Sequence, residues 1–598
     1  MLLSPIEKVP KCHSIHSHAS RQSRRCIRIY RDRTIWDEKL KSDIDTVSFR
    51  TRSPTFGQHG MVATSQIYAT QVGVDVLKKG GSAVDAAIAA NAMLSLTEPY
   101  MCGPGGDLFA LVWDPQSCSL AGLNASGRSP RGLSFASLLS AIGDAATIPA
   151  RGPLALSVPG AVDGWCALHE RYGKLPLSDV FAPAIDHARA GVPIGLRTAQ
   201  TWAHAAGNIL DDPVLAGLTE AFSETFLIDG VAPRAGQIFR NPELAETFET
   251  IGRGGREAFY EGFPADQIIT CQAAAGGFLS LEDFRSSHFD WVTPLTTSYR
   301  GYDVYELPPN GQGLCVLQML NLLEDYPLRE LGPYSADYWH AFIEAKKLSF
   351  EDRARYYADP AFSDIPATAL IDKSYADARR VLIDPKSAGA DYAYGNVSIA
   401  GGDTTYLTVA DSAGMMVSLI QSIFTAFGAG LVPSAVGFGL QSRSAGFSLE
   451  IGHPNVYAPA KRPFHTIIPA FVLQDGRPWL STGVMGADMQ PQGQVQVLIN
   501  MIDFDLDPQA AGDAPRMRHY GGRQPNGVRL DGLGVVRYEA AIRPALVAEL
   551  QRRGHRMELF DDWIGDFIGG YQAIRYDARD EVYVAGSEPR LDGCALGY

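Results

Sequence analysis

A change of sequence period at Thr404 constrains the fold more than any other feature of the chain. After Thr404, Thr405, Leu407 and Val409 alternate with Tyr406, Thr408 and Ala410, the turn Asp411–Gly414 follows, and Met415–Gln421 is a second apolar run. Alternation with a period of two, then a short turn, predicts a β-hairpin. Two later runs, Ile467–Leu473 and Val582–Ala585, also predict strands.

Helical segments separate these strands. Periodic apolar residues predict helices at Gly493–Met501 and Arg543–Arg552, and another at Tyr338–Tyr357 that ends before Asp359-Pro360. Residues 160–290 are predicted to be mainly helical. Strands that alternate with helices indicate sheets whose outer faces are covered by helices.

The N-terminal half supplies one well-marked helix. Ser82 and Asp85 have the spacing of a capping box, which predicts an alanine-rich helix from Ala83 to about Leu96. The glycine-rich segment Gly103–Asp107 follows and predicts a tight loop. It lacks the Lys and Ser/Thr of a phosphate site, so a turn is favoured over phosphate binding. Leu108–Trp113 is the next predicted strand.

Composition narrows the functional classes. The 598 residues are 46% hydrophobic and 20% charged, with a net charge of −14. An acidic chain of this kind disfavours nucleic acid and anionic membrane as partners. The most apolar stretch, Ala83–Thr97, is too short and too polar to span a bilayer. The eight cysteines contain no CxxC motif, which favours a reduced compartment, and a cytoplasmic location is expected.

Residues 1–45 differ from the rest. Positions 1–33 hold eight Lys/Arg against two acids, without the apolar core of a secretory signal. This composition fits an organelle-targeting peptide, and equally a disordered extension or a misassigned start. Cys12, His13, His16 and His18 could bind a metal, although their spacing matches no standard zinc site.

Chemistry is harder to read from residue patterns alone. There is no GxSxG, HExxH or Walker motif. In Gly401–Thr405 a glycine-containing loop runs into the predicted strand. A threonine hydroxyl needs a base beside it to act as a nucleophile. If the Asp403–Thr404 bond were cut, the new α-amine of Thr404, with a pKa of roughly 7.7–8.0, would be that base.

Motifs in a fixed order give stronger information. From about residue 50 to Tyr598 the chain resembles the γ-glutamyltransferase family of N-terminal-nucleophile hydrolases. The matching segments are Gly80–Ala87, Val158–Trp165, Tyr172–Pro176, Pro308–Gly313, Asp403–Thr405, Phe427–Gly430, Lys461–Pro463 and Asp592–Tyr598.

The resemblance implies an α/β fold of the four-layer αββα sandwich type. It implies a proenzyme that cleaves itself between Asp403 and Thr404 into a large subunit, 46–403, and a small subunit, 404–598. These fragments would stay together as a heterodimer, and higher homo-oligomers are left open. The resemblance implies no metal and no organic cofactor.

Several residue roles carry over with the resemblance. Gly486 and Ala487 match the loop whose backbone N–H groups bind the oxyanion, although Ala487 replaces a glycine. Ser422 matches a threonine that hydrogen-bonds the nucleophile, and Arg128 matches the arginine that binds a substrate carboxylate. The alternative for Gly486 and Ala487 is an ordinary turn. For Ser422 it is a strand hydroxyl bonded to backbone, and for Arg128 a surface arginine.

Departures from the family pattern bear on the substrate. Arg443 stands where a Gln is expected, Gly446 replaces an Asp that binds an α-amino group, and Phe424 replaces an Asn. His465 and Thr466 replace a Ser-Ser pair. A pocket that loses a carboxylate and gains an arginine favours an anionic or neutral group over an ammonium. The alternative for Arg443 is a solvated surface arginine without a role in binding. The alternative for His465 is a hydrogen-bonded core histidine.

This pattern is similar to the subgroup that contains oxamate amidohydrolase. It predicts a self-processing amidohydrolase or acyltransferase that cleaves amides of small acidic acyl groups through a threonine acyl-enzyme. The alternatives are a γ-glutamyltransferase or glutathione hydrolase, and an unprocessed, non-catalytic binding protein. The identity of the physiological amide stays open.

The sequence predicts a specific cleavage product. Intact mass should show fragments of ~43 and ~21 kDa, by proportion of the 64.6 kDa chain. N-terminal sequencing of the smaller fragment should give Thr-Thr-Tyr-Leu-Thr. A Thr404→Ala variant should stay one chain, because it lacks the attacking hydroxyl. A Thr404→Ala variant cut at the same bond would refute this assignment.

Overall fold

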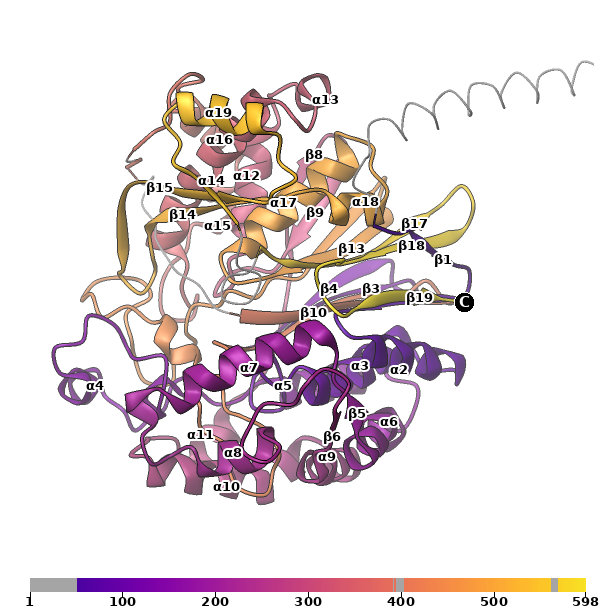
Figure 1. Ribbon diagram of the computed structural model, residues 1–598, viewed down its shortest axis with the longest axis vertical. Helices are drawn as coiled ribbons and strands as arrows, with labels where there is room; N and C mark the ends of the chain where they lie inside the picture. The colour runs from indigo at the N-terminus through magenta and orange to yellow at the C-terminus, as the bar shows by residue number, and fades with distance from the viewer. Residues whose placement is uncertain (1–50, 391, 394–402, 561–567) are drawn as a thin grey trace, which may run out of the picture. The chain divides into compact units, whose positions relative to one another are not determined.

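Two stacked antiparallel β-sheets form the middle of the molecule (Figure 1). The computed structural model describes residues 51–390, 392–393, 403–560 and 568–598. Within them, each sheet has seven strands. The first has the order β1 (Thr55–Gly57), β18 (Val582–Ser587), β17 (Gly570–Asp577), β13 (Arg477–Met485), β12 (Ala470–Gln474), β9 (Tyr302–Glu306), β8 (Leu295–Tyr299).

The second sheet contains the predicted hairpin at its centre. Its order is β19 (Cys594–Gly597), β2 (Gly60–Thr64), β10 (Asp403–Asp411), β11 (Met416–Phe424), β3 (Asp107–Asp114), β4 (Ser119–Ala125), β7 (Asp290–Val292). The two sheets pack face to face, and in the interface the hydroxyl of Thr408 in β10 lies 2.7 Å from that of Ser481 in β13.

Helices cover both outer faces of the sheet pair, so the four-layer αββα prediction is confirmed (Figure 1). On one side lie α12 (Leu314–Leu323), α14 (Ala336–Tyr356), α16 (Lys373–Arg380), α17 (Met489–Ile502), α18 (Pro508–Asp513) and α19 (Pro544–Arg552). On the other lie α2 (Ile67–Lys78), α3 (Ala83–Thr97), α5 (Ala161–Tyr172), α6 (Leu177–Ala190), α7 (Leu196–Leu210), α9 (Pro242–Tyr260), α10 (Phe263–Ala274) and α11 (Leu281–Ser286).

Each sheet is built from chain on both sides of the predicted cleavage bond. In the second sheet, β10 pairs with β2, and β11 pairs with β3, both of which precede residue 403. In the first sheet, β12 pairs with β9, and β18 pairs with β1. Ladder hydrogen bonds and a shared core therefore hold the two predicted subunits together.

Helix α3 begins where the capping box predicts. The Asp85 N–H donates to Ser82 Oγ at 3.1 Å, and Asp85 Oδ2 accepts from the Ser82 N–H at 2.9 Å. The same carboxylate oxygen also accepts from the N–H groups of Lys174 and Leu175. All of α3 is buried, and its many alanines let it pack closely beneath β10 and β11.

Other predicted elements differ at their edges. The strand predicted at Ile467–Leu473 begins at Ala470, because the Ile468 N–H donates to the Gln490 side chain instead of joining the sheet. The helix predicted at Tyr338–Tyr357 is Ala336–Tyr356. The N-terminal predictions, including the metal-type cluster at Cys12–His18, lie outside the described residues. In the part of the chain that the structure describes, no helix combines the length and apolarity needed to cross a bilayer.

Asp85 gives a test of how α3 is anchored. Asp85→Ala should lower the free energy of unfolding by about 3 kcal/mol, because one buried and two half-buried backbone N–H groups lose a carboxylate acceptor. Urea unfolding followed by tryptophan fluorescence would measure the loss. The matched control is Asp75→Ala, since Asp75 is exposed on α2 and its carboxylate accepts from the exposed Gln71 side chain. Equal losses in both variants would contradict the anchoring role.

Candidate active site

The predicted nucleophile lies at the start of the central strand β10. In the β10–β11 ladder Asp403 pairs with Phe424 and Thr405 with Gln421, with an irregularity between them. The backbone of Thr404 therefore lies opposite Ser422 and Ile423. The side chains of Asp403 and Thr404, and residues 394–402, lie outside what the structure describes.

Ser422 is held in a defined orientation beside this backbone. It is fully buried on β11, and its hydroxyl oxygen accepts from Arg443 Nη2 at 2.9 Å and from the Phe424 N–H at 2.9 Å. A hydroxyl has two acceptor lone pairs and one proton. Because both lone pairs are engaged, the Ser422 proton is directed away from Arg443 and Phe424, as a donor.

Arg443 is fully buried, so the alternative of a solvated surface arginine is wrong. Its Nη1 donates to Thr466 Oγ1 at 3.0 Å, and its guanidinium lies 4.3 Å from the centre of the Phe424 ring. The Nε atom has no partner among the described residues. Burial lowers the pKa of Arg443 to about 9, against the opposing charge of Asp107. Its contact with substrate stays a prediction.

His465 is the hydrogen-bonded buried histidine of the alternative interpretation. Its Nε2 lies 2.9 Å from Asp107 Oδ2, and both side chains are fully buried. Burial, reinforced by the Arg443 charge, lowers the pKa of His465 to about 3, so the ring is neutral near pH 7. A carboxylate only accepts, so Nε2 carries the proton. Nδ1 is then an acceptor, and no described residue contacts it with a hydrogen bond.

Asp107 links the segments that carry the predicted site residues. Its Oδ1 accepts from the N–H groups of Gly127 and Gly160 at 2.8 and 3.2 Å, and from Gln441 Nε2 at 3.0 Å. It also pairs with Ser422 across the β3–β11 ladder. Sequence reasoning treated Gly103–Asp107 as a turn and gave Asp107 no role. The sequence feature that could have indicated this role is an aspartate between a glycine-rich loop and an apolar strand.

The predicted oxyanion loop joins β13 to α17. Gly486 and Ala487 have positive φ angles of 116° and 56°. Ala487 therefore adopts the left-handed conformation that its family glycine would favour, at a modest steric cost. The N-terminus of α17 follows directly, and its amides add positive potential there. This setting suits binding of a developing oxyanion, although the role itself stays a prediction.

Gln312 connects the oxyanion loop to the arginine side of the site. Its Nε2 donates to the backbone carbonyls of Thr466 at 2.6 Å and Ala487 at 3.0 Å. Its Oε1 accepts from Arg353 Nη1, which also pairs with Asp488 at 2.7 Å. Gln312 lies in one of the family motifs, Pro308–Gly313, but no role for it follows from the sequence pattern.

Arg128 lies at the rim of this group. It follows β4, and its side chain is 24% exposed. Its Nη1 lies 3.4 Å from Asp359 Oδ2 and 3.3 Å from the Ala460 carbonyl. Burial and the neighbouring Arg462 lower the pKa of Arg128. Hydrogen bonds thus join Ser422, Arg443 and Thr466. Asp107 bonds His465 and also Gly127, the residue before Arg128.

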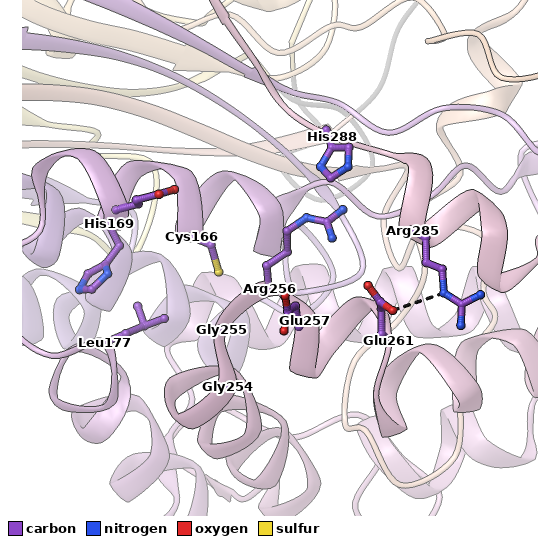
Figure 2. Close-up of a pocket in the computed structure, with 11 residues that line it drawn as sticks. Cys166, His169, Leu177, Gly254, Gly255, Arg256, Glu257, Glu261, Arg285 and His288 are labelled. Carbon is purple, nitrogen blue, oxygen red and sulfur yellow. Dashed lines mark hydrogen bonds and ion pairs between the residues drawn. The ribbon is translucent and has the colours of Figure 1, made fainter.

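A separate pocket of about 630 Å³ lies among α5, α9 and α11 (Figure 2). It contains none of the predicted site residues. Its charged side chains are largely paired: Arg285 Nε lies 3.3 Å from Glu261, and Arg256 Nε lies 2.7 Å from Asp163. Burial raises the pKa of Cys166, which lines it, to about 12, so its thiol is a poor nucleophile.

One group of metal-type side chains occurs within the described ranges: His340, Glu344 and His555, whose ligand atoms lie within 4.8 Å of one another. His340 Nδ1 and His555 Nε2 are hydrogen-bonded to each other at 2.8 Å. Glu344 accepts from Lys347 Nζ at 2.7 Å, and also from the Gly389 N–H and the Tyr392 hydroxyl. Since these groups satisfy one another, the cluster is a structural network.

Gln312 gives a test of the site's framework. Gln312→Leu should lower kcat of the predicted amidase by ~10–100-fold, because the oxyanion loop and Thr466 lose their shared donor. KM should change less. Gln494→Leu is the matched control, since Gln494 is a buried glutamine of α17 that bonds the Ile468 carbonyl. Equal kcat losses in the two variants would show a packing effect only. Steady-state kinetics on folded, cleaved protein decide the point.

Comparisons with known proteins agree with this geometry. The model of the family described as Gamma-glutamyltranspeptidase matches residues 69–598. The chain is 35% identical to the Glutathione hydrolase-like YwrD proenzyme of Bacillus subtilis, over 90% of this chain and 99% of that protein. It is 32% identical to the Oxamate amidohydrolase proenzyme of Klebsiella pneumoniae, over 91% and 100%. The crystal structure of cephalosporin acylase from Bacillus halodurans superposes with a TM-score of 0.84 at 38% identity, covering 92% and 97%. The chain belongs to the γ-glutamyltransferase family of N-terminal-nucleophile hydrolases.

Proposed function

We propose that this chain is a proenzyme that cuts itself before Thr404 and then hydrolyses amides of small acidic acyl groups. The observation that carries the acidic specificity is Arg443, a buried guanidinium that forms no ion pair with any described carboxylate, bonded to Ser422 beside the nucleophile's backbone. Two relatives named as proenzymes, one of them an oxamate amidohydrolase, support the class of reaction.

Self-cleavage uses the threonine hydroxyl. Thr404 Oγ attacks the carbonyl carbon of Asp403, a C–O bond forms, and the C–N bond breaks to leave an ester and a free α-amine. Water then hydrolyses the ester, which restores the hydroxyl and leaves a carboxylate on Asp403. The position of Thr404 at the first residues of a sheet-centre strand holds it fixed for this attack.

The catalytic cycle repeats the same chemistry on a substrate. The α-amine takes the proton of Thr404 Oγ as the oxygen attacks the amide carbonyl. The N–H groups of Gly486 and Ala487 bind the oxyanion, and the α-amine returns the proton to the leaving amine. Water, activated by the same amine, attacks the acyl-enzyme and releases a carboxylic acid.

The substrate pocket differs from one that holds an ammonium group. Gly446, in the short helical turn Arg443–Gly446, stands where the family places an amino-binding Asp. Arg128, which the family resemblance retains as the carboxylate-binding arginine, is 24% exposed at the rim. An acyl group with a terminal carboxylate and no α-amino group fits this retained arginine and the lost Asp.

Glutathione hydrolysis or γ-glutamyl transfer is the second candidate. A relative carrying the name Glutathione hydrolase-like, 35% identical over 90% of the chain, favours it. The two candidates differ in whether the acyl group carries an α-ammonium, so a matched pair of substrates separates them.

Glutaryl-p-nitroanilide and γ-glutamyl-p-nitroanilide form that pair, because they differ only in the α-amino group. The glutaryl compound should have the higher kcat/KM, by ~10-fold or more, since an ammonium near a buried guanidinium is disfavoured. Release of p-nitroaniline measures both. Butyryl-p-nitroanilide, which lacks the terminal carboxylate, tests whether that carboxylate is needed. Oxamate tests whether an amide of a shorter acid is accepted. Thr404→Ala should be inactive on all of them. Preference for the γ-glutamyl compound would establish the second candidate instead.

A further inference from the structure

Arg443 combines burial, charge and hydroxyl partners in an unusual way. It is fully buried, and its two terminal nitrogens are committed to Ser422 Oγ at 2.9 Å and Thr466 Oγ1 at 3.0 Å. In the described part of the chain it forms no ion pair, and Asp107 is the nearest opposing influence on it. A buried charge without a bonded counter-ion is costly in free energy. Its field also acts more strongly on neighbouring ionisable groups than it would in water.

The backbone of Thr404 lies across the β10–β11 ladder from the residue that Arg443 bonds. Ser422, which Arg443 bonds, lies on β11 where the ladder places Thr404 opposite residues 422 and 423. One hydroxyl therefore separates the guanidinium from the strand position whose nitrogen becomes the α-amine after cleavage.

We infer that Arg443 is a positioning residue, whose charge keeps the α-amine of Thr404 neutral and whose hydrogen bond fixes Ser422 as a donor to the nucleophile. The inference rests on the proposed function, since it needs the cleaved amine. It goes beyond it by giving the Arg443 charge a second effect, on the catalytic base, in addition to its effect on which acyl groups the pocket accepts.

The electrostatic part follows from like charges. Protonating an amine beside a fixed cation is disfavoured, so the guanidinium lowers the pKa of the α-amine below its usual value. A lower pKa leaves more of the amine neutral near pH 7, and only the neutral amine accepts the Thr404 proton.

The hydrogen-bonding part follows from the lone pairs of Ser422. Arg443 and the Phe424 N–H engage both, so the Ser422 hydroxyl can only donate further. A hydrogen bond donated by Ser422 to Thr404 Oγ would stabilise negative charge on the attacking oxygen. Stacking on the Phe424 ring, 4.3 Å away, holds the guanidinium in place for both effects.

Other ionisable groups face this region and have to be separated from Arg443. The pKa of His465 is about 3, so this ring does not titrate near neutrality. Burial raises the pKa of Glu98, which accepts from Thr405 Oγ1 at 3.0 Å and is the main competing titration. Neighbouring elements also carry Asp107, Glu306, Cys102 and the Arg353–Asp488 pair. Two further cations are Arg462, whose charge acts on His465, and Arg151, which bonds Thr425 Oγ1.

The test compares full-length, self-cleaved wild type with Arg443→Met, Arg443→Lys, Thr466→Val and Glu98→Gln. The pH profile of kcat/KM on glutaryl-p-nitroanilide gives one reading of the α-amine. Competitive acetylation of Thr404 with acetic anhydride, followed by mass spectrometry of the small fragment, gives its pKa without any substrate. Circular dichroism and intact mass confirm folding and cleavage.

Arg443→Met should move the acid limb, and the labelling pKa, up by about one pH unit. Arg443→Lys and Thr466→Val keep the charge and should keep the acid limb, with kcat lowered because the fork on Ser422 and Thr466 is incomplete. Glu98→Gln should retain the Arg443-dependent shift when combined with Arg443→Met.

An unshifted α-amine in folded, cleaved Arg443→Met would overturn the inference while leaving the proposed function intact. If Arg443→Met fails to fold or cleave, Arg443→Lys decides. A rise of the α-amine pKa by about one pH unit in Arg443→Lys, which retains the charge, would overturn the inference. An unshifted α-amine pKa with lowered kcat would support it. Absence of cleavage and turnover in the wild type would instead remove the proposed function itself.

Discussion

The carboxylate of Asp107 is the interaction on which the arrangement of the candidate site depends. It is fully buried and accepts four hydrogen bonds, from Gly127, Gly160, Gln441 and His465. Hydrogen bonds to a charged acceptor are each worth about 1.5–3 kcal/mol. Through them one side chain fixes four segments, each adjacent in sequence to a residue of the site or to a helix start. The predicted substrate residues come from distant parts of the chain, and this carboxylate is their common reference.

The sequence predicted the parts of the fold that local patterns determine. The capping box at Ser82 and Asp85 placed α3 to within one residue, and alternation after Thr404 placed the central hairpin. The strand expected from Ile467 starts later, because Ile468 bonds the Gln490 side chain. An apolar run does not show that a backbone N–H near its start is hydrogen-bonded to a side chain of a neighbouring helix.

The site itself could be predicted only in part. Residue patterns alone left Thr404 at a loop-to-strand junction, and the nucleophile came from the family resemblance. That resemblance also selected Ser422, Arg443 and His465, which the structure brings together. It did not reveal that Arg443 bonds hydroxyls in a buried position, or that Asp107 and Gln312 join the parts. Those contacts cross large sequence separations and leave no local periodicity.

The sharing of both sheets across the predicted cleavage bond has a consequence for how the protein matures. Strands β2, β3 and β9 have their ladder partners in the later segment, so neither fragment holds a complete sheet. Because Thr404 lies in β10, the predicted nucleophile takes its position only when β10 has entered the assembled sheet. Cleavage therefore acts as a record of folding history: a cut molecule is one that once reached the native arrangement. The ratio of cut to uncut chains in a preparation then reports folding yield directly, even in samples that were later denatured.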